Sequence, residues 1–168
     1  MKKSEQKDLH TVSLLVANKP GVLVRIALVF ARRAFNIESL VVSPTVDPRF
    51  STMTITAKGN PATLDQIIKQ AGKLIDVIHV GEHTRLDAIE KEMALLKVRR
   101  KPTTKASLDK LLKRFHAHAI DITDSTLIIE QTGSTTELDE LEAELTKYGI
   151  IEMVRTGKVV MARGKEPT

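Results

Sequence analysis

The stretch TVSLLVANKPGVLVRIALVFARRAFNIESLVVSPT, from Thr11 to Thr45, carries the clearest information on how this chain folds. It begins in an apolar strand, predicted over residues 9–17, and continues into the four-residue turn NKPG at residues 18–21. A long apolar helix, predicted over residues 21–35, follows the turn, and a second apolar strand covers residues 36–44. A strand, a turn, a helix and a strand in this order predict a binding unit.

The turn matters because a helix begins there, and the first four amides of a helix have no carbonyl partner inside it. Such an end attracts anions through hydrogen bonds and the helix dipole. Pro20 suits the first helical turn, and Gly21 has no Cβ, so a ligand or another backbone can approach it closely. Asn18 can cap the helix or donate its amide to a ligand, and the sequence leaves both alternatives open. A helix start without a ligand is the plainer interpretation of a Pro-Gly turn taken alone.

The helix carries more apolar residues than one core face needs. One stripe has the spacing of a core-facing helix and consists of Leu23, Ile26, Ala27, Phe30 and Ala34. A second stripe lies beside it and consists of Val24, Leu28, Ala31 and Phe35. Arg25, Arg32 and Arg33 mark the wet face. Because a surface helix needs only one apolar stripe, the second predicts that another domain or subunit covers this helix.

The rest of the first half completes a βαββαβ unit. Residues 50–58 alternate between apolar residues and threonines, which predicts a half-buried strand with an exposed threonine face. Asn60 and Pro61 predict the start of a second helix, and residues 74–80 predict the fourth strand. Exposed edge strands must be paired or blunted. Since residues 12–16 and 40–43 contain few blocking charges, we expect a homodimer with joined sheets or packed helices.

The second half repeats this element order. The expected elements are a strand at residues 93–99, a helix after residues 103–107, strands at 119–123 and 126–131, a helix from 134 to 149, and a hairpin of residues 150–154 and 158–162. Ser134 and Glu137 have the spacing of a capping box, and Gly149 marks the end of that helix. The chain is therefore predicted to be α+β, with two βαββαβ units in tandem.

Composition excludes several classes of protein. With 168 residues, 42% of them hydrophobic, the chain can build folded cores, and zero cysteine excludes disulfides, thiol chemistry and cysteine metal sites. Residues 1–8 show no signal-peptide pattern and are expected to form a disordered basic leader. No apolar run approaches the roughly 20 residues that span a bilayer. We therefore expect a cytoplasmic protein with no membrane partner.

The net charge of +5 arises in residues 1–86, where 12 Lys and Arg face 7 Asp and Glu, because the remaining residues hold 14 of each sign. A basic cluster in the second half comprises Lys97, Arg99, Arg100, Lys101, Lys105, Lys110, Lys113 and Arg114. Such a cluster binds nucleic acid or an acidic partner, or is simply a solvated helix face. With no Trp, one Tyr and four Phe, platforms for stacking bases are nearly absent, so we expect no nucleic-acid partner.

A search for catalytic groups finds no nucleophile elbow, phosphate-binding loop, dinucleotide fingerprint or zinc-protease motif. His79 and His83 would lie about 13 Å apart on an extended strand, too far to share a metal. His116 and His118 flank a helix end without an evident third ligand, so a zinc site there has little support. Glu38 has no partner acid or base. The sequence favours a binding module over an enzyme.

Three segments together resemble a known family. They are NKPGVLVRIALVFARRAFNIESLVVSPTVDPRFSTMTI at residues 18–55, QIIKQAGKLIDVIHV at residues 66–80 and EKEMALLKV at residues 90–98. The chain is similar to the small regulatory subunit of acetohydroxyacid synthase, also called acetolactate synthase. The resemblance implies two ferredoxin-like βαββαβ domains: an ACT effector-binding domain at residues 9–84, which dimerises, and a C-terminal domain at residues 85–168.

The resemblance also implies a function. Members of this family bind the catalytic large subunit, raise its activity and confer feedback inhibition by valine or another branched-chain amino acid, leucine or isoleucine. The cofactors thiamine diphosphate, Mg and FAD are expected on that catalytic subunit and none on this chain, which is expected to be non-catalytic. The alternatives are a stand-alone ACT-domain regulator of another enzyme or of transcription, and a small ferredoxin-like enzyme.

The family places its effector pocket at the ACT dimer interface. Carried over by motif, the pocket residues here are Asn18, Pro20, Gly21, Val22, Leu23, Asn36 and Ile37. Amides at the helix start would hold the α-carboxylate, Asn36 the α-amino group, and the second apolar stripe the branched side chain. Thr52 stands where the family usually has arginine, and Lys19 where a smaller or acidic residue is common. These departures bear on contact with the catalytic subunit and on effector preference.

Overall fold

The computed structural model describes residues 8–83, 88–165 and 168, and the chain divides into two compact units. The first unit runs to Glu90 and also contains the segment from Gly157 onward, whereas the second unit is Lys91–Thr156. The expected boundary between residues 84 and 85 and the expected leader, apart from Asp8, lie outside the described residues. The last segment of the chain therefore groups with the first half of the sequence.

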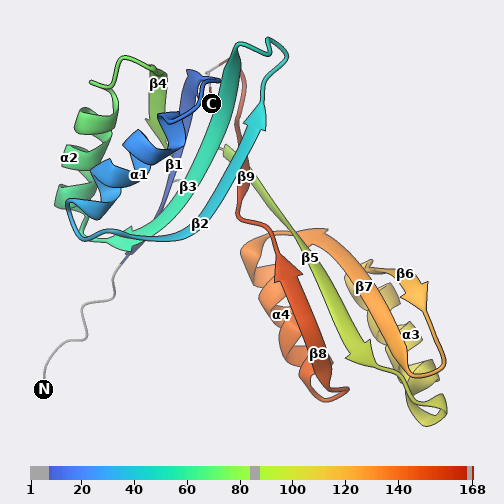
Figure 1. Cartoon of the computed structure of the whole chain (residues 1–168). Helices are drawn as coiled ribbons and strands as arrows, with labels where there is room; N and C mark the ends of the chain where they lie inside the picture. The colour runs from blue at the N-terminus through green and yellow to red at the C-terminus, as the bar shows by residue number, and fades with distance from the viewer. Residues whose placement is uncertain (1–7, 84–87, 166–167) are drawn as a thin grey trace, which may run out of the picture. The chain divides into compact units, whose positions relative to one another are not determined.

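The first unit contains six elements in the order expected. They are β1 (Asp8–Ala17), α1 (Val22–Ala31), β2 (Asn36–Pro44), β3 (Phe50–Gly59), α2 (Pro61–Ala71) and β4 (Val77–Glu82) (Figure 1). The strands form an antiparallel sheet in the order β2-β3-β1-β4. The predicted βαββαβ unit is confirmed. The prediction that residues 12–16 form an open edge is wrong, because β1 pairs with both β3 and β4 and leaves β2 and β4 at the edges.

Helices α1 and α2 lie on one face of this sheet and cover the core (Figure 1). The α1 residues in the core are Val22, Ile26, Val29 and Phe30. The prediction that Leu23 faces the core is wrong, since its side chain is 42% exposed. Phe35, placed by its spacing on the second stripe, is buried in the same core. Because α1 is apolar over a wide surface, its sequence is compatible with several orientations of the helix about its own axis. Packing against the sheet selects one of these orientations.

The opposite face of the sheet is also closed, so the expectation of an exposed threonine face is wrong at Thr54 and Thr56, which are buried. Directly paired strand residues share a face, and these threonines pair with Val41 and Ser39 of β2. Gly157 contacts both β2 residues: a Cβ placed on it would come within 2.6 Å of the Ser39 hydroxyl. The C-terminal segment of the chain therefore packs on this face, at a position where only glycine fits.

The second unit repeats the arrangement. Its elements are β5 (Ala88–Arg99), which begins in the first unit, a 3-10 turn (Pro102–Thr104), α3 (Lys105–Phe115), β6 (His118–Ile122), β7 (Thr126–Gly133), α4 (Thr135–Thr146) and β8 (Ile150–Arg155). β9 (Val159–Ala162) follows in the segment that groups with the first unit. The sheet order is β6-β7-β5-β8, with a core of its own from β5, α3, β7 and α4. The predicted tandem of ferredoxin-like units is confirmed. No described helix is long and apolar enough to cross a membrane.

The predicted hairpin between β8 and β9 is wrong, because both strands pair with β5. Thr156 continues the line of β8: its backbone N–H donates to the Met93 carbonyl (2.9 Å), and the Met93 N–H donates to its hydroxyl (3.0 Å). Further on, Lys158 pairs with Glu90 at 2.6 Å. β5 is 12 residues long and β8 only six, so an unpaired length of β5 is available to β9.

Candidate functional site

The turn between β1 and α1 is braced against the loop between β2 and β3. The Asn18 side chain donates its amide to the Pro48 carbonyl (3.0 Å), and its backbone N–H donates to the Arg49 carbonyl (2.8 Å). Of the two alternatives for Asn18, the structure excludes helix capping, because the cap position is Gly21 and no side chain caps α1. Asn18 therefore fixes the shape of the turn.

Gly21 has a left-handed backbone, with φ of 82°, which glycine adopts at little cost. The conformation turns the chain sharply into α1 and leaves several amides of the first turn without an acceptor. The Val22 N–H reaches the Lys19 carbonyl only at 3.4 Å. Within the part of the chain that the structure describes, no acceptor meets the N–H groups of Gly21, Leu23 or Val24. These free amides, at the positive end of the helix dipole, suit a carboxylate.

An apolar surface begins beside these amides and continues along α1. It consists of side chains that are between 42% and 61% exposed, namely Leu23, Val24 and Leu28. The neighbouring edge strand β2 adds two more exposed apolar side chains, Leu40 and Val42. We call these five residues the α1 surface. Val24 and Leu28 of the predicted second stripe are thus exposed within the single chain, and their cover by a second body stays a prediction.

Asn36 opens β2 and is exposed. Its amide donates to the Glu38 carboxylate at 2.8 Å, and Lys58 approaches the other carboxylate oxygen at 3.4 Å. The hydrogen bond from Asn36 lowers the pKa of Glu38, and Lys58 acts in the same direction, so this carboxylate stays ionised. Ile37 is partly buried against the core. The Ile37 side chain therefore attaches the start of β2 to the core of the first unit.

The structure does not bring all predicted site residues together within one chain. Asn18, Pro20, Gly21, Val22 and Leu23 lie at the turn, next to the Phe50 end of β3, because Ala17 pairs with Phe50. Asn36 pairs with Lys58, at the opposite end of the same strand. Eight residues of extended strand separate the two ends by about 26 Å. A ligand the size of an amino acid therefore cannot touch both groups of residues within one chain.

Two charged residues beside the turn were not singled out from the sequence as site residues. Arg25 of α1 pairs with Asp76, which precedes β4, at 2.6 Å. The Asp76 carbonyl also accepts the Ala17 N–H at 2.8 Å, so it is tied to the last residue of β1. The sequence feature that could have pointed to Arg25 is its place near the start of α1, where a cation is unfavourable and no acidic residue offsets it. The partner, 51 residues away, follows only from the fold.

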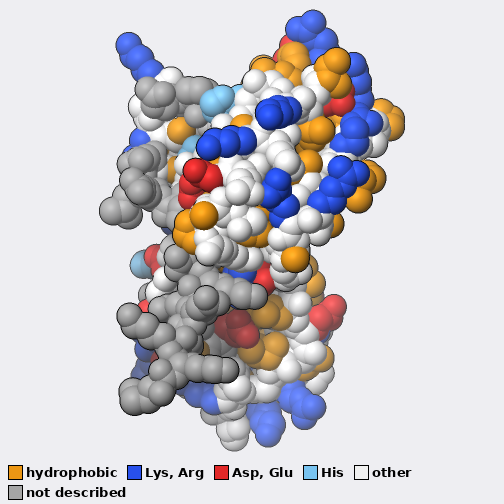
Figure 2. Space-filling view, turned by 90° about the vertical axis from the view of Figure 1, so that its left-hand side faces the viewer, with side chains coloured by type: hydrophobic (Ala, Val, Ile, Leu, Met, Phe, Trp, Pro, Cys, Tyr) orange, Lys and Arg blue, Asp and Glu red, His pale blue; other side chains and the backbone are white. Residues whose placement is uncertain are grey.

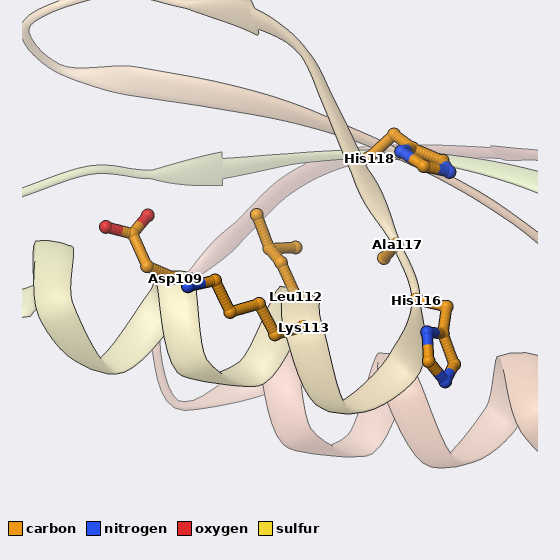
Figure 3. Close-up of a pocket in the computed structure, with 6 residues that line it drawn as sticks. All are labelled: Asp109, Leu112, Lys113, His116, Ala117 and His118. Atoms are coloured by element: carbon orange, nitrogen blue, oxygen red, sulfur yellow. The ribbon is translucent and has the colours of Figure 1, made fainter.

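The second unit has an open cavity of about 470 Å³ at the end of α3 (Figure 3). It is lined by Asp109, Leu112, Lys113, His116, Ala117 and His118. The imidazoles of His116 and His118 point in different directions (Figure 3). Among residues 8–83, 88–165 and 168, no group of three or more His, Asp or Glu side chains is placed to hold a metal ion. The cavity therefore gives the suggested zinc site no support.

Comparisons with known proteins identify both halves of the chain. A model of the AHAS small subunit-like ACT domain matches residues 12–79, and a model of the small subunit of acetolactate synthase matches residues 91–164. A probable acetolactate synthase small subunit from Archaeoglobus fulgidus is 41% identical over 157 residues, which cover 94% of this chain and 98% of that protein. The acetolactate synthase small subunit of Mycolicibacterium smegmatis is also 41% identical, over 92% of this chain and 91% of its own.

A solved structure agrees with these sequence matches. The crystal structure of the acetolactate synthase small subunit from Thermotoga maritima superposes with a TM-score of 0.85 at 38% identity, over 95% of this chain and 99% of that one. The similarity therefore covers both units and their order. The resemblance predicted from the sequence is confirmed: the chain belongs to the family of acetolactate synthase small regulatory subunits.

Proposed function

We propose that this chain regulates an acetolactate synthase holoenzyme by binding its catalytic subunit, raising the activity of that subunit, and inhibiting it when a branched-chain amino acid accumulates. Valine is the first candidate effector, with leucine and isoleucine next. The observation that carries the proposal is the free amide cluster at Gly21, Leu23 and Val24 beside the exposed α1 surface. An amino acid with an apolar side chain matches both features.

The effector pocket is completed by a second copy of the chain. β2 is an edge strand, and the α1 surface next to it is apolar and uncovered within the described residues. A two-fold axis beside β2 would set the two β2 strands antiparallel. Asn36 of the partner subunit would then lie at the same end as the turn of the first chain. The turn of one chain and Asn36 of the partner subunit would thus lie close together, although the turn and Asn36 of the same chain are about 26 Å apart.

Each part of a branched-chain amino acid then has a counterpart. The free amides donate hydrogen bonds to the α-carboxylate, Asn36 of the partner subunit meets the α-amino group, and the α1 surface contacts the branched side chain. Hydrogen bonds to charged groups contribute about 1.5–3 kcal/mol each. The loss of translational freedom offsets a large part of this gain. Binding in the micromolar to sub-millimolar range follows, which suits a metabolite sensor.

The chain itself is proposed to be non-catalytic. We assign thiamine diphosphate, Mg and FAD to the catalytic subunit and none to this chain. Effector binding would favour one dimer arrangement, and the catalytic subunit would prefer one arrangement as well. Thermodynamic linkage then requires that catalytic-subunit binding change the effector affinity by the same factor as the effector changes subunit affinity. A coupling free energy of about 1–3 kcal/mol is sufficient for such regulation.

Reconstitution with the catalytic subunit tests this function. Adding the chain is expected to raise acetolactate production, and valine is expected to lower it again. Asn36→Ala should keep the activation and weaken the inhibition, because it removes a pocket contact without touching the core. Thr132→Ala, an exposed position in the second unit, serves as the matched control and should behave like the wild type. Loss of activation with inhibition retained would contradict the assignment of Asn36.

A further inference from the structure

Arg25 lies over the turn that precedes the free amides. Its Nη2 donates to the Asp76 carboxylate at 2.6 Å, while its Nη1 is 3.3 Å from the position that a Cβ on Gly21 would occupy. The Arg25 side chain is 48% exposed, and the Asp76 side chain is only 13% exposed. The partly buried Asp76 therefore holds the guanidinium in place at the surface. A side chain at position 21 would crowd this guanidinium, as well as straining the backbone.

The charge of Arg25 is placed where the helix itself disfavours it. The N-terminal end of a helix carries a partial positive charge, so a cation in its first turn is unfavourable. The first turn of α1 contains no acidic residue that would offset this cation. Asp76 is the partner that the described residues supply, and it engages Nη2 alone. The remaining guanidinium donors and the free amides together suit an anion.

Further basic residues lie on the surface of the first unit around Arg25. Exposed basic residues are Arg25 on α1, Arg32 at its C-terminal cap, Lys69 on α2 and Lys73 just after α2, and Lys19 lies in the turn itself. Figure 2 shows basic side chains spread among apolar ones over the first unit, in the upper part of the view. Clustered charge of one sign raises the local concentration of the opposite ion. Lys69 pairs with Asp65 at 4.0 Å, so the cations at the start of α1, Lys19 and Arg25, are the ones that favour an anionic ligand.

We propose that Arg25, held by Asp76, recognises the α-carboxylate of the effector and makes the site selective for a free amino acid over its uncharged derivatives. The inference rests on the proposed function, since it assigns a residue to the effector pocket proposed there. Guanidinium has five N–H donors in a planar fork that matches a carboxylate. The apolar α1 surface selects the side chain of the effector. Arg25 selects its head group.

The test compares two ligands that differ only at the head group. Calorimetry on the full chain measures the affinity for valine and for valinamide, in which a neutral amide replaces the carboxylate. The wild type should prefer valine by at least tenfold. Arg25→Gln should weaken valine binding ten- to a hundredfold, leave valinamide binding nearly unchanged, and so abolish the preference. Arg25→Lys, which keeps the charge but loses the fork, should retain part of it.

Matched variants separate recognition from folding. Arg32→Gln removes an exposed cation from the C-terminal cap of the same helix, and it should leave both affinities unchanged. Asp76→Asn keeps the charge of Arg25 but weakens its anchor, so it should weaken valine binding less than Arg25→Gln does. Circular dichroism melts of all variants verify that the unit is folded. A loss of both affinities to the same degree in Arg25→Gln would indicate a structural role and overturn the inference.

The outcomes also distinguish this inference from the function on which it rests. If the wild-type chain binds no branched-chain amino acid, alone or with the catalytic subunit, the proposed function and the inference both fail. If the wild type prefers valine to valinamide and Arg25→Gln keeps that preference, only the assignment of Arg25 fails. The amides of Leu23 and Val24 would then account for carboxylate recognition without it.

Discussion

At the scale of single residues, two glycines of the first unit face different surroundings. A Cβ on Gly59 would lie 2.1 Å from the Phe35 ring, which is itself buried. A Cβ on Gly72 would meet its nearest neighbours at 3.4 Å, an ordinary contact, and its backbone φ is −65°. The core therefore has no room for a methyl group at Gly59, and it has room at Gly72.

We predict that Gly59→Ala lowers the free energy of unfolding of the first unit by about 1–3 kcal/mol, the usual cost of overpacking a core. Gly72→Ala, the control, should leave stability unchanged or raise it by about 0.4–1 kcal/mol, because alanine restricts the unfolded chain. Hydrogen exchange of the β3 amides reports on the unit alone. Equal stabilities of the two variants would show that Phe35 can move aside.

At the scale of secondary structure, α4 depends on a capping box that the sequence predicted and the structure confirms. The Glu137 N–H donates to the Ser134 hydroxyl at 3.3 Å, and the Ser134 N–H donates to the Glu137 carboxylate at 2.7 Å. Ser134→Ala removes the acceptor of the cap. We expect it to destabilise the second unit by about 1 kcal/mol in urea unfolding. Thr136→Ala, an exposed position in the same turn, is the control and should be nearly neutral.

The same capping box predicts a pH dependence. Hydrogen bonds from the backbone and side chain of Ser134 hold the pKa of Glu137 below its ordinary value of 4.5. A carboxylate with a lowered folded-state pKa stabilises the fold fully above its unfolded pKa, and this contribution is lost as the pH falls through the folded value. The stability difference between the wild type and Glu137→Ala should thus be largest near pH 7 and shrink below pH 4.5. A difference independent of pH would exclude the charged cap.

At the scale of the whole molecule, the proposed homodimer depends on the α1 surface. Leu28 is 46% exposed in one chain, and a lysine in its place would put a charge into the proposed interface. We predict that Leu28→Lys sediments as a monomer at micromolar concentration and loses effector binding. Ile75→Lys, at a position that is 97% exposed and lies outside α1, should remain dimeric. A dimer that survives Leu28→Lys would place the interface elsewhere.

Local sequence signals are sufficient to predict the elements and their order. Pro20 and Gly21 mark the turn, Asn60 and Pro61 start α2, and Ser134 starts α4, because capping and turn chemistry depends on residues within four positions of one another. The structure bears out each of these: Gly21 is left-handed, and Asn60 caps α2 through its side chain. Motif similarity identified the family as well.

Long-range packing selects which of several equivalent arrangements the chain adopts. The sequence could not determine three features: the orientation of α1 about its axis, the central position of β1 in its sheet, and the pairing of β9 with β5. Each of them depends on contacts between residues far apart in the chain. The pairing of Arg25 with Asp76 and the separation of Asn36 from the turn are further examples. Local propensity fixes elements, whereas the register and packing of distant strands fix what those elements bring together.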